Sequence, residues 1–179
     1  LSGCRNLRLC LEWKIKKSVM FNVILYNPEI PSNTGNILRL CANSGAKLHL
    51  IKPLGFNLDN KNLKRAGMDY DEVSNINLYN DIDHCLEKNK INKVFALTKF
   101  ANENAFEKVF APNDAFIFGN ETSGLPNNIL EKVSETNKIR IPMLEKSRSL
   151  NLSNSVSIII YEAWKQNNFF NAQISFFDN

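Results

Sequence analysis

The sequence lacks the residue patterns that most often build metal sites and disulfide frameworks. Its cysteines, Cys4, Cys10, Cys41 and Cys85, form no C-x-x-C pair and no regular spacing, and the chain has 2 histidines. We therefore expect reduced thiols and no metal. The chain also has no apolar run near the ~20 residues of a membrane span, and its N-terminal segment lacks a signal-like apolar run with a cleavage site. These absences favour a cytoplasmic protein without a membrane partner.

The chain also lacks net charge outside its first nineteen residues. The overall charge is +4, and residues 1–19 alone hold five bases against one acid. From Met20 onward 17 bases balance 17 acids, so contact with a nucleic acid would depend on local clusters. Taken alone, a cluster of this kind is more often a solvated face than a binding site. The clusters are Lys61, Lys64 and Arg65, and Lys138, Arg140, Lys146 and Arg148.

Length and composition favour one domain. A chain of 179 residues can hide roughly 70% of its unfolded surface in a single core. A strand-like run begins directly after Met20. We interpret residues 1–19 as an N-terminal extension of unknown role, residues 20–166 as the folded domain and residues 167–179 as a C-terminal tail.

Short apolar runs bounded by breakers alternate with helical patterns along the domain. This alternation predicts an α/β fold, in which helices flank a parallel sheet. One helix should begin at Ser32 or Asn33, whose side chains could cap it, and end at Gly45, with Arg39 pointing away from its apolar face. The expected strands are residues 21–26, 47–51, 93–98, 115–118 and 138–141.

A final helix is expected over residues 152–166, with a wide apolar stripe. Burial on the chain's own sheet accounts for part of this stripe, and Ile158 and Trp164 widen it enough to allow a partner surface as well. The residues of the stripe are Val156, Ile159, Ile160, Ala163 and Trp164.

Three polar, glycine-punctuated segments follow predicted strands, where ligands gather in α/β sheets. They span residues 27–39, 119–126 and 141–154. The second has glycines at 119 and 124 but no Lys-Ser or Lys-Thr after Gly124, and the chain contains no G-x-G-x-x-G. A nucleotide-like ligand would therefore bind without the usual phosphate fingerprints. A capped helix start and a long capping loop are the plainer interpretations of the first and third segments.

The motifs themselves resemble those of a known family. The runs are L-Y-N-P-E-I-P-S-N-T-G-N-I-L-R-L-C-A-N, K-R-A-G-M-D-Y and I-R-I-P-M followed by S-R-S-L-N-L-S-N-S-V-S-I-I-I-Y-E-A-W. They are similar to the SpoU branch of SPOUT methyltransferases, and within it to the tRNA (cytidine/uridine-2′-O)-methyltransferases. The resemblance covers about residues 20–166.

The resemblance implies an α/β knot fold, in which the C-terminal part of the chain forms a trefoil knot. Such knots are very rare among known folds. It implies a homodimer formed through the first and last helices. It further implies S-adenosylmethionine as cofactor and a tRNA wobble cytidine or uridine as substrate, methylated on the ribose 2′-hydroxyl. A SpoU-type enzyme for another tRNA or rRNA position, and a non-catalytic RNA-binding knot protein, are the alternatives.

The resemblance also assigns site residues. Arg39 matches the arginine placed against the target hydroxyl, and because a guanidinium stays charged we expect it to stabilise alkoxide character rather than accept the proton. The other expected catalytic residues are Asn33, Glu121 and Asn151. The expected cofactor residues are Leu97, Thr98, Gly119, Gly124, Ile141, Met143, Ser149 and Leu150, and the expected RNA-binding residues are Lys64, Arg65 and Tyr161.

Overall fold

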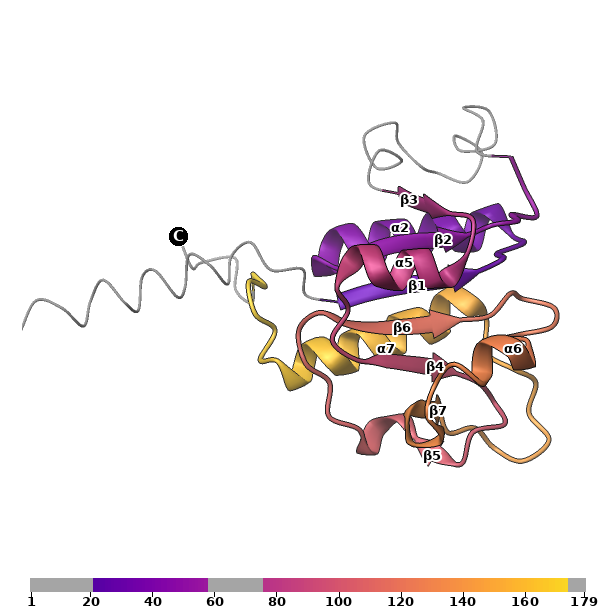
Figure 1. Ribbon diagram of the computed structural model, residues 1–179. Helices are drawn as coiled ribbons and strands as arrows, with labels where there is room; N and C mark the ends of the chain where they lie inside the picture. Colours follow the sequence, from indigo (N-terminus) through magenta and orange to yellow (C-terminus); the bar gives the residue numbers. More distant parts are fainter. Residues whose placement is uncertain (1–20, 58–75, 174–179) are drawn as a thin grey trace, which may run out of the picture.

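The computed structural model describes residues 21–57 and 76–173, which form a seven-stranded parallel sheet (Figure 1). The strand order is β3-β2-β1-β6-β4-β7-β5, and every pairing in it is parallel. The strands are β1 (Phe21–Tyr26), β2 (Lys47–Ile51), β3 (Ile76–Tyr79), β4 (Val94–Leu97), β5 (Glu103–Asn104), β6 (Asp114–Phe118) and β7 (Lys138–Arg140).

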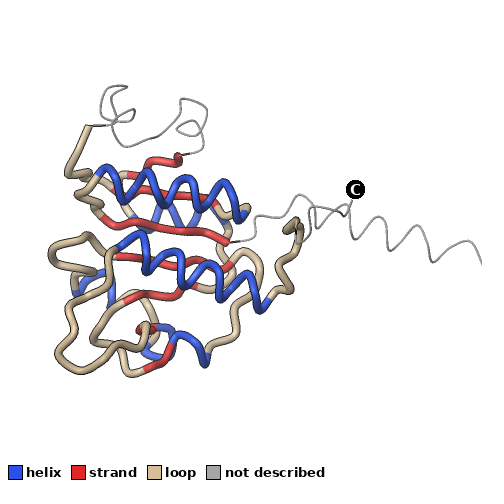
Figure 2. Tube along the Cα trace, turned by 180° about the vertical axis from the view of Figure 1, so that it is seen from behind, coloured by secondary structure: helices blue, strands red, loops and turns tan. Residues whose placement is uncertain are grey.

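Helices cover both faces of the sheet. Helices α2 (Pro31–Ser44) and α7 (Leu152–Gln166) lie side by side on one face, which Figure 2 shows from the front, and α5 (Ile82–Asn89) and α6 (Asn127–Leu130) lie on the other. Two 3-10 turns, Ala105–Glu107 and Glu135–Asn137, precede β6 and β7. Alternate residues of the central strands pack against the two helical layers: Val23 and Leu25 belong to the α2/α7 core, and Ile24 to the α5/α6 core. None of the helices in the described part of the chain is long and apolar enough to cross a bilayer.

The predicted α/β fold is confirmed. All five expected strands are present to within one residue at each end, and the final helix has the expected bounds. Patterning missed β3 and β5: β3 lies at an edge with half-exposed residues, and β5 has two residues, so neither carries a full apolar run.

The start of α2 differs from the prediction. Ile30 is the N-cap residue, Pro31 occupies the first turn and no side chain caps the helix. Ser32 and Asn33 are therefore not caps, because proline already fixes the φ angle needed to enter the helix. The predicted stop is confirmed, since Gly45 has φ 72°, a left-handed conformation that glycine adopts without strain.

The apolar stripe of α7 is buried within the chain. Val156, Ile159 and Ile160 are fully buried and Trp164 is 7% exposed, in the core shared with α2 and the sheet. The stripe therefore needs no partner to cover it. Ile158, next to it, stays half-buried.

Strand β7 occupies an unusual place in the sheet. It pairs with both β4 and β5, although β4 and β5 follow each other in sequence and are joined by residues 98–102. Helix α6 precedes β7 on one face of the sheet and α7 follows it on the other. The chain thus passes from one face of the sheet to the other at β7, the strand that lies between β4 and β5.

Candidate active site

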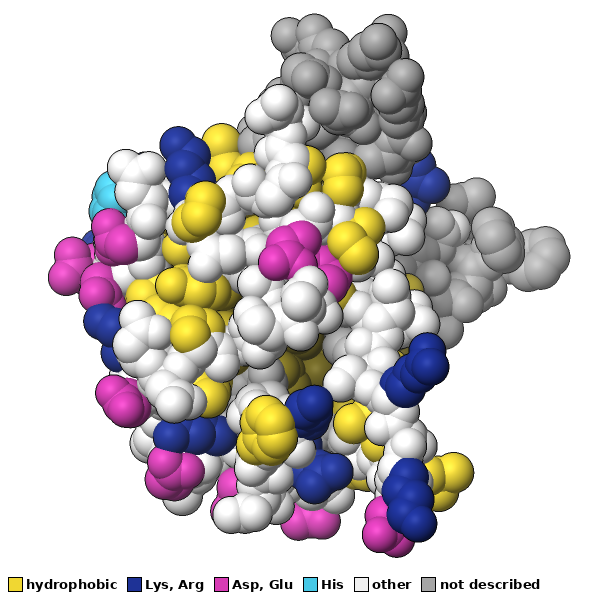
Figure 3. Space-filling model, turned by 90° about the vertical axis from the view of Figure 1, so that its right-hand side faces the viewer, with side chains coloured by type: hydrophobic (Ala, Val, Ile, Leu, Met, Phe, Trp, Pro, Cys, Tyr) yellow, Lys and Arg dark blue, Asp and Glu magenta, His cyan; other side chains and the backbone are white. Residues whose placement is uncertain are grey.

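A cavity of about 410 Å³ lies at the carboxyl ends of β4, β6 and β7. Leu97, Phe118 and Arg140, the last residues of these strands, line it together with parts of all three polar segments. Figure 3 views this edge of the sheet and shows the hollow between the loops. All eight residues expected to bind the cofactor line the cavity: Leu97, Thr98, Gly119, Gly124, Ile141, Met143, Ser149 and Leu150.

The turn after β6 is built tightly around its two glycines. A Cβ atom on Gly119 would lie 2.0 Å from the carbonyl carbon of Gly124, so only glycine allows this approach. Gly124 itself has φ +74°. The Asn120 carboxamide oxygen accepts hydrogen bonds from the backbone N–H groups of Ser123 (2.7 Å) and Gly124 (3.2 Å). The turn is therefore fixed from inside, which holds the neighbouring side chains in place.

Glu121 in this turn joins the β6 loop to the start of α2. Its carboxylate accepts hydrogen bonds from the backbone N–H groups of Glu29 (2.8 Å) and Ile30 (3.2 Å) and from the Asn33 side-chain amide (2.9 Å). The Thr122 hydroxyl donates to the Glu29 carboxylate at 2.5 Å and adds a second link. A charged acceptor with three donors makes strong hydrogen bonds, so the two loops are held as one unit.

Asn151 extends the same network to α7. Its amide donates to the Asn33 carboxamide oxygen at 3.0 Å, while its own carboxamide oxygen caps α7 through the Ser153 and Asn154 backbone N–H groups. Asn33 is 5% exposed and has both polar ends of its side chain occupied. Glu121, Asn33 and Asn151 therefore form a continuous chain of hydrogen bonds along one wall of the cavity.

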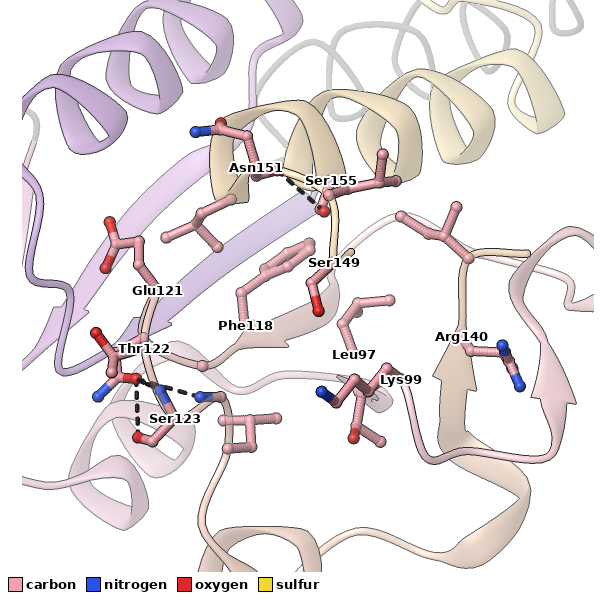
Figure 4. Close-up of a pocket in the computed structure, with 18 of the residues that line it drawn as sticks. Leu97, Lys99, Phe118, Glu121, Thr122, Ser123, Arg140, Ser149, Asn151 and Ser155 are labelled. Carbon is pink, nitrogen blue, oxygen red and sulfur yellow. Dashed lines mark hydrogen bonds between the residues drawn. The ribbon is translucent and has the colours of Figure 1, made fainter. Parts of the chain in front are cut away.

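The two ends of the cavity differ in charge. Figure 4 shows Glu121 at one end and Lys99 and Arg140 at the other, with Leu97 and Phe118 between them. Sequence reasoning did not assign Lys99 to the site and noted Arg140 only as part of a basic cluster. Arg140 is the last residue of β7 and Lys99 lies two residues after the end of β4, and that position at the carboxyl edge was the available signal.

Arg39 does not belong to the cavity lining. It is exposed on α2, as its helical position predicted. Tyr161, 47% exposed on α7, also lies outside the cavity lining and packs against Trp164 with ring centroids 5.7 Å apart. The expected RNA contacts Lys64 and Arg65, with Lys61, lie outside the described residues.

The ionisable side chains in the lining of the cavity are Glu121, Lys99 and Arg140. Among the residues that the structure describes, neither a histidine nor a cysteine lines the cavity. Burial raises the pKa of the Cys41 and Cys85 thiols to about 12, so both stay protonated. Burial, with a smaller contribution from Lys47, lowers the pKa of His49 to about 4, and this neutral side chain lies in β2 outside the cavity lining. No group of three His, Cys, Asp or Glu side chains within residues 21–57 and 76–173 could hold a metal ion.

The fold and the cavity define an α/β protein with a cavity among the loops at the carboxyl edge of a parallel sheet. The chain belongs to the SpoU rRNA Methylase family, whose model matches residues 20–161. This confirms the resemblance drawn from the motifs.

Individual relatives align over nearly their whole length. The tRNA (cytidine(34)-2′-O)-methyltransferase of Methylovorus glucosotrophus is 47% identical over 150 residues, which is 84% of this chain and 97% of the relative. The protein of the same name from Escherichia coli K12 is 48% identical, over 82% of this chain and 94% of its own. A solved structure described as giving insights into the 2-OH methylation of C/U34 on tRNA is 38% identical with a TM-score of 0.75, over 84% of this chain and 97% of its own.

Proposed function

We propose that this protein transfers a methyl group from S-adenosylmethionine to the ribose 2′-hydroxyl of the tRNA wobble nucleotide, a cytidine or uridine at position 34. The cavity at the carboxyl edge of the sheet carries the proposal, because it brings the predicted cofactor residues together beside Asn33, Glu121 and Asn151. The names of the relatives supply the substrate. The cytoplasm is the proposed place of action.

The residues present fit S-adenosylmethionine. The cavity of about 410 Å³ lies within the ~300–1,000 Å³ of typical ligand pockets, and Leu97, Ile141 and Leu150 give it apolar walls suited to an adenine ring. Loop backbone groups at Thr98, Gly119 and Met143 would supply the polar contacts. The bound cofactor supplies an electrophilic methyl group on a sulfonium.

The protein's own task is then alignment and activation of the hydroxyl. Because the group displaced from a sulfonium would be a neutral thioether, the protein would need no acid at the leaving group, and positioning would account for much of the rate. Asn33, Glu121 and Asn151 hold the loops around the cavity in one arrangement. Arg39 would place a fixed positive charge beside the developing alkoxide, with a substrate phosphate or water accepting the proton.

The position of Arg39 supports a site shared between two copies of the chain. Arg39 is exposed on α2, beside α7, and does not line the cavity of its own chain. We place a homodimer interface on the outer side of the α2/α7 layer, where the half-buried Ile158 lies, so that Arg39 of one copy meets the cavity of the other. Tyr161, Lys64 and Arg65 would then contact the tRNA.

The proposed trefoil knot is supported by the path of the chain around β7. The strand lies between β4 and β5, which are consecutive, and the chain then passes to the opposite face to form α7. A loop closed by residues 98–102 and threaded by the segment after β7 would account for this path. Such threading would also explain why Thr98 and residues 141–150 meet in one cavity.

A methyl-transfer assay tests the function. Purified protein and S-adenosylmethionine should methylate bulk tRNA, and mass mapping of tRNA from cells with and without the gene should locate the mark at position 34. A mark at another tRNA position or in rRNA would replace the substrate by that of a sister enzyme. Absence of transfer, with RNA binding retained, would leave a non-catalytic RNA-binding protein.

A further inference from the structure

Phe100 exposes its ring at the rim of the cavity. It is 79% exposed and lines the cavity three residues after the end of β4, whereas Phe95, Phe116 and Phe118 in β4 and β6 are at most 2% exposed. Single exposed apolar residues are common and need no function. An aromatic ring that faces solvent beside a ligand cavity is nevertheless positioned to contact whatever large substrate covers that opening.

The backbone that carries Phe100 is anchored on both sides. The Phe100 N–H donates to the Thr98 hydroxyl at 3.3 Å, and the Ala101 N–H donates to the Thr98 carbonyl at 3.3 Å. The Thr98 N–H donates in turn to the Ile139 carbonyl of β7 at 3.0 Å, and Ala101 is buried at 7% exposure. The ring therefore projects from a short, hydrogen-bonded turn rather than from a long loop, which lowers the entropy lost when it binds a partner.

Positive charge lies at this end of the cavity. The Lys99 ammonium lies 5.1 Å from the Phe100 ring centroid, and Arg140 lines the same end of the cavity as Lys99 (Figure 4). The salt bridges of the described residues involve other lysines, and neither Lys99 nor Arg140 takes part in one. An exposed ring close to cations that form no salt bridge within the described residues matches single-stranded RNA, which offers flat bases joined by phosphates.

We propose that Phe100 is an RNA-stacking residue, whose ring stacks on a nucleobase next to the target nucleotide while Lys99 and Arg140 contact the adjoining phosphates. The inference rests on the proposed function, since it names how the same site grips its tRNA. Stacking on either neighbour would hold the target ribose against the cavity mouth, because only one sugar-phosphate unit separates adjacent bases. Unlike the backbone contacts expected for the cofactor, this contact is made by a side chain.

Substitutions at Phe100 separate stacking from general apolar contact. Phe100→Ala should weaken tRNA binding about tenfold and raise KM by a similar factor, the scale of one lost base stack. Phe100→Leu should bind tRNA as weakly as Phe100→Ala, whereas Phe100→Trp should bind tRNA like the unaltered chain. The matched control is Phe106→Ala, because Phe106 is 44% exposed and lies outside the cavity lining. That variant should bind tRNA like the unaltered chain, and all variants should keep their S-adenosylmethionine affinity and melting temperature.

Anticodon stem-loops with an abasic nucleotide on one side of the target locate the contact. Removal of the stacked base should weaken binding by the unaltered chain about tenfold and abolish the difference between that chain and Phe100→Ala. Three results would overturn the stacking role in a protein that still methylates tRNA. They are equal tRNA affinity of Phe100→Ala and the unaltered chain, full tRNA affinity of Phe100→Leu, and a Phe100→Ala variant that loses only its affinity for the cofactor. An unaltered chain that neither binds nor methylates tRNA overturns the proposed function, and the stacking role with it.

Discussion

The Asn33 side chain donates a 2.9 Å hydrogen bond to the Glu121 carboxylate across 88 residues of sequence. One residue lies in the first turn of α2 and the other in the loop after β6. Two backbone N–H groups ahead of α2 bind the same carboxylate. A single side chain therefore fixes the relation between two of the three loops that form the cavity.

Replacing Glu121 by glutamine should destabilise the protein and lower its activity. The glutamine amide nitrogen would face one of the N–H donors that now meet a carboxylate oxygen, leaving that donor unpaired at a cost of about 2 kcal/mol. Urea unfolding and a methyl-transfer assay measure the two effects. Glu131→Gln, at an exposed carboxylate outside the cavity lining, should change neither. A Glu121→Gln variant as stable as the original would contradict the fixing role.

Replacing Gly119 by alanine should abolish cofactor binding. The new methyl group would meet the Gly124 backbone at 2.0 Å, so the turn has to open and the cavity wall moves. Calorimetry with S-adenosylmethionine measures the loss. Gly45→Ala is the control. An alanine at φ +72° costs about 1 kcal/mol of stability, but its added Cβ would meet no neighbouring group within 4 Å, so the site should be unchanged. Normal cofactor affinity of the Gly119→Ala variant would show that this turn is not part of the cofactor site.

Replacing Arg39 by alanine should separate binding from turnover. Because Arg39 does not line the cavity, cofactor affinity should stay within a few-fold, while kcat should fall by ~10² or more through loss of a preorganised charge. Asn36→Ala, also exposed on α2, serves as the control in the same rate assay. A near-normal rate for Arg39→Ala sinks the catalytic assignment.

A charge at Ile158 should test the dimer without entering the core. The unaltered protein should sediment as a dimer at micromolar concentration, and Ile158→Glu should yield a folded monomer, because an unpaired charge in an interface costs several kcal/mol. Ile160 is unsuited to this test, since it is fully buried within its own chain and a charge there would unfold the protein. Glu87→Gln, exposed on α5 at the opposite face of the sheet, should stay dimeric. A monomeric unaltered protein rules out the shared site.

His49 should make stability depend on pH. Burial lowers its pKa from 6.5 to about 4 in the folded chain. Between these two pH values the unfolded chain therefore binds a proton at this side chain and the folded chain does not. Stability should therefore fall as the pH drops from 6.5 towards 4, by about 3 kcal/mol over the whole window. Urea unfolding at several pH values measures the slope. His49→Gln should flatten it, whereas an unchanged slope would assign the dependence to other groups.

The sequence by itself determined the layered α/β fold and the identity of most cavity residues. Strands such as Phe21–Tyr26 are apolar along their length because both faces are covered, and this pattern is local and readable. The motifs around Asn33, Gly119 and Asn151 were also readable locally. They marked the three loops because glycines and short polar residues stand at fixed offsets from strands.

Only the tertiary structure decided which of these residues meet. Asn33 was expected to cap a helix, and instead it joins Glu121 and Asn151, because Pro31 had already satisfied the helix start and the β6 loop presented a carboxylate. Lys99 and Phe100 joined the cavity because β7 lies beside β4, a pairing between residues some forty positions apart. Local pattern records which face of an element is apolar. It carries no information on which distant loop completes a hydrogen bond, because that choice depends on the order of strands in the sheet.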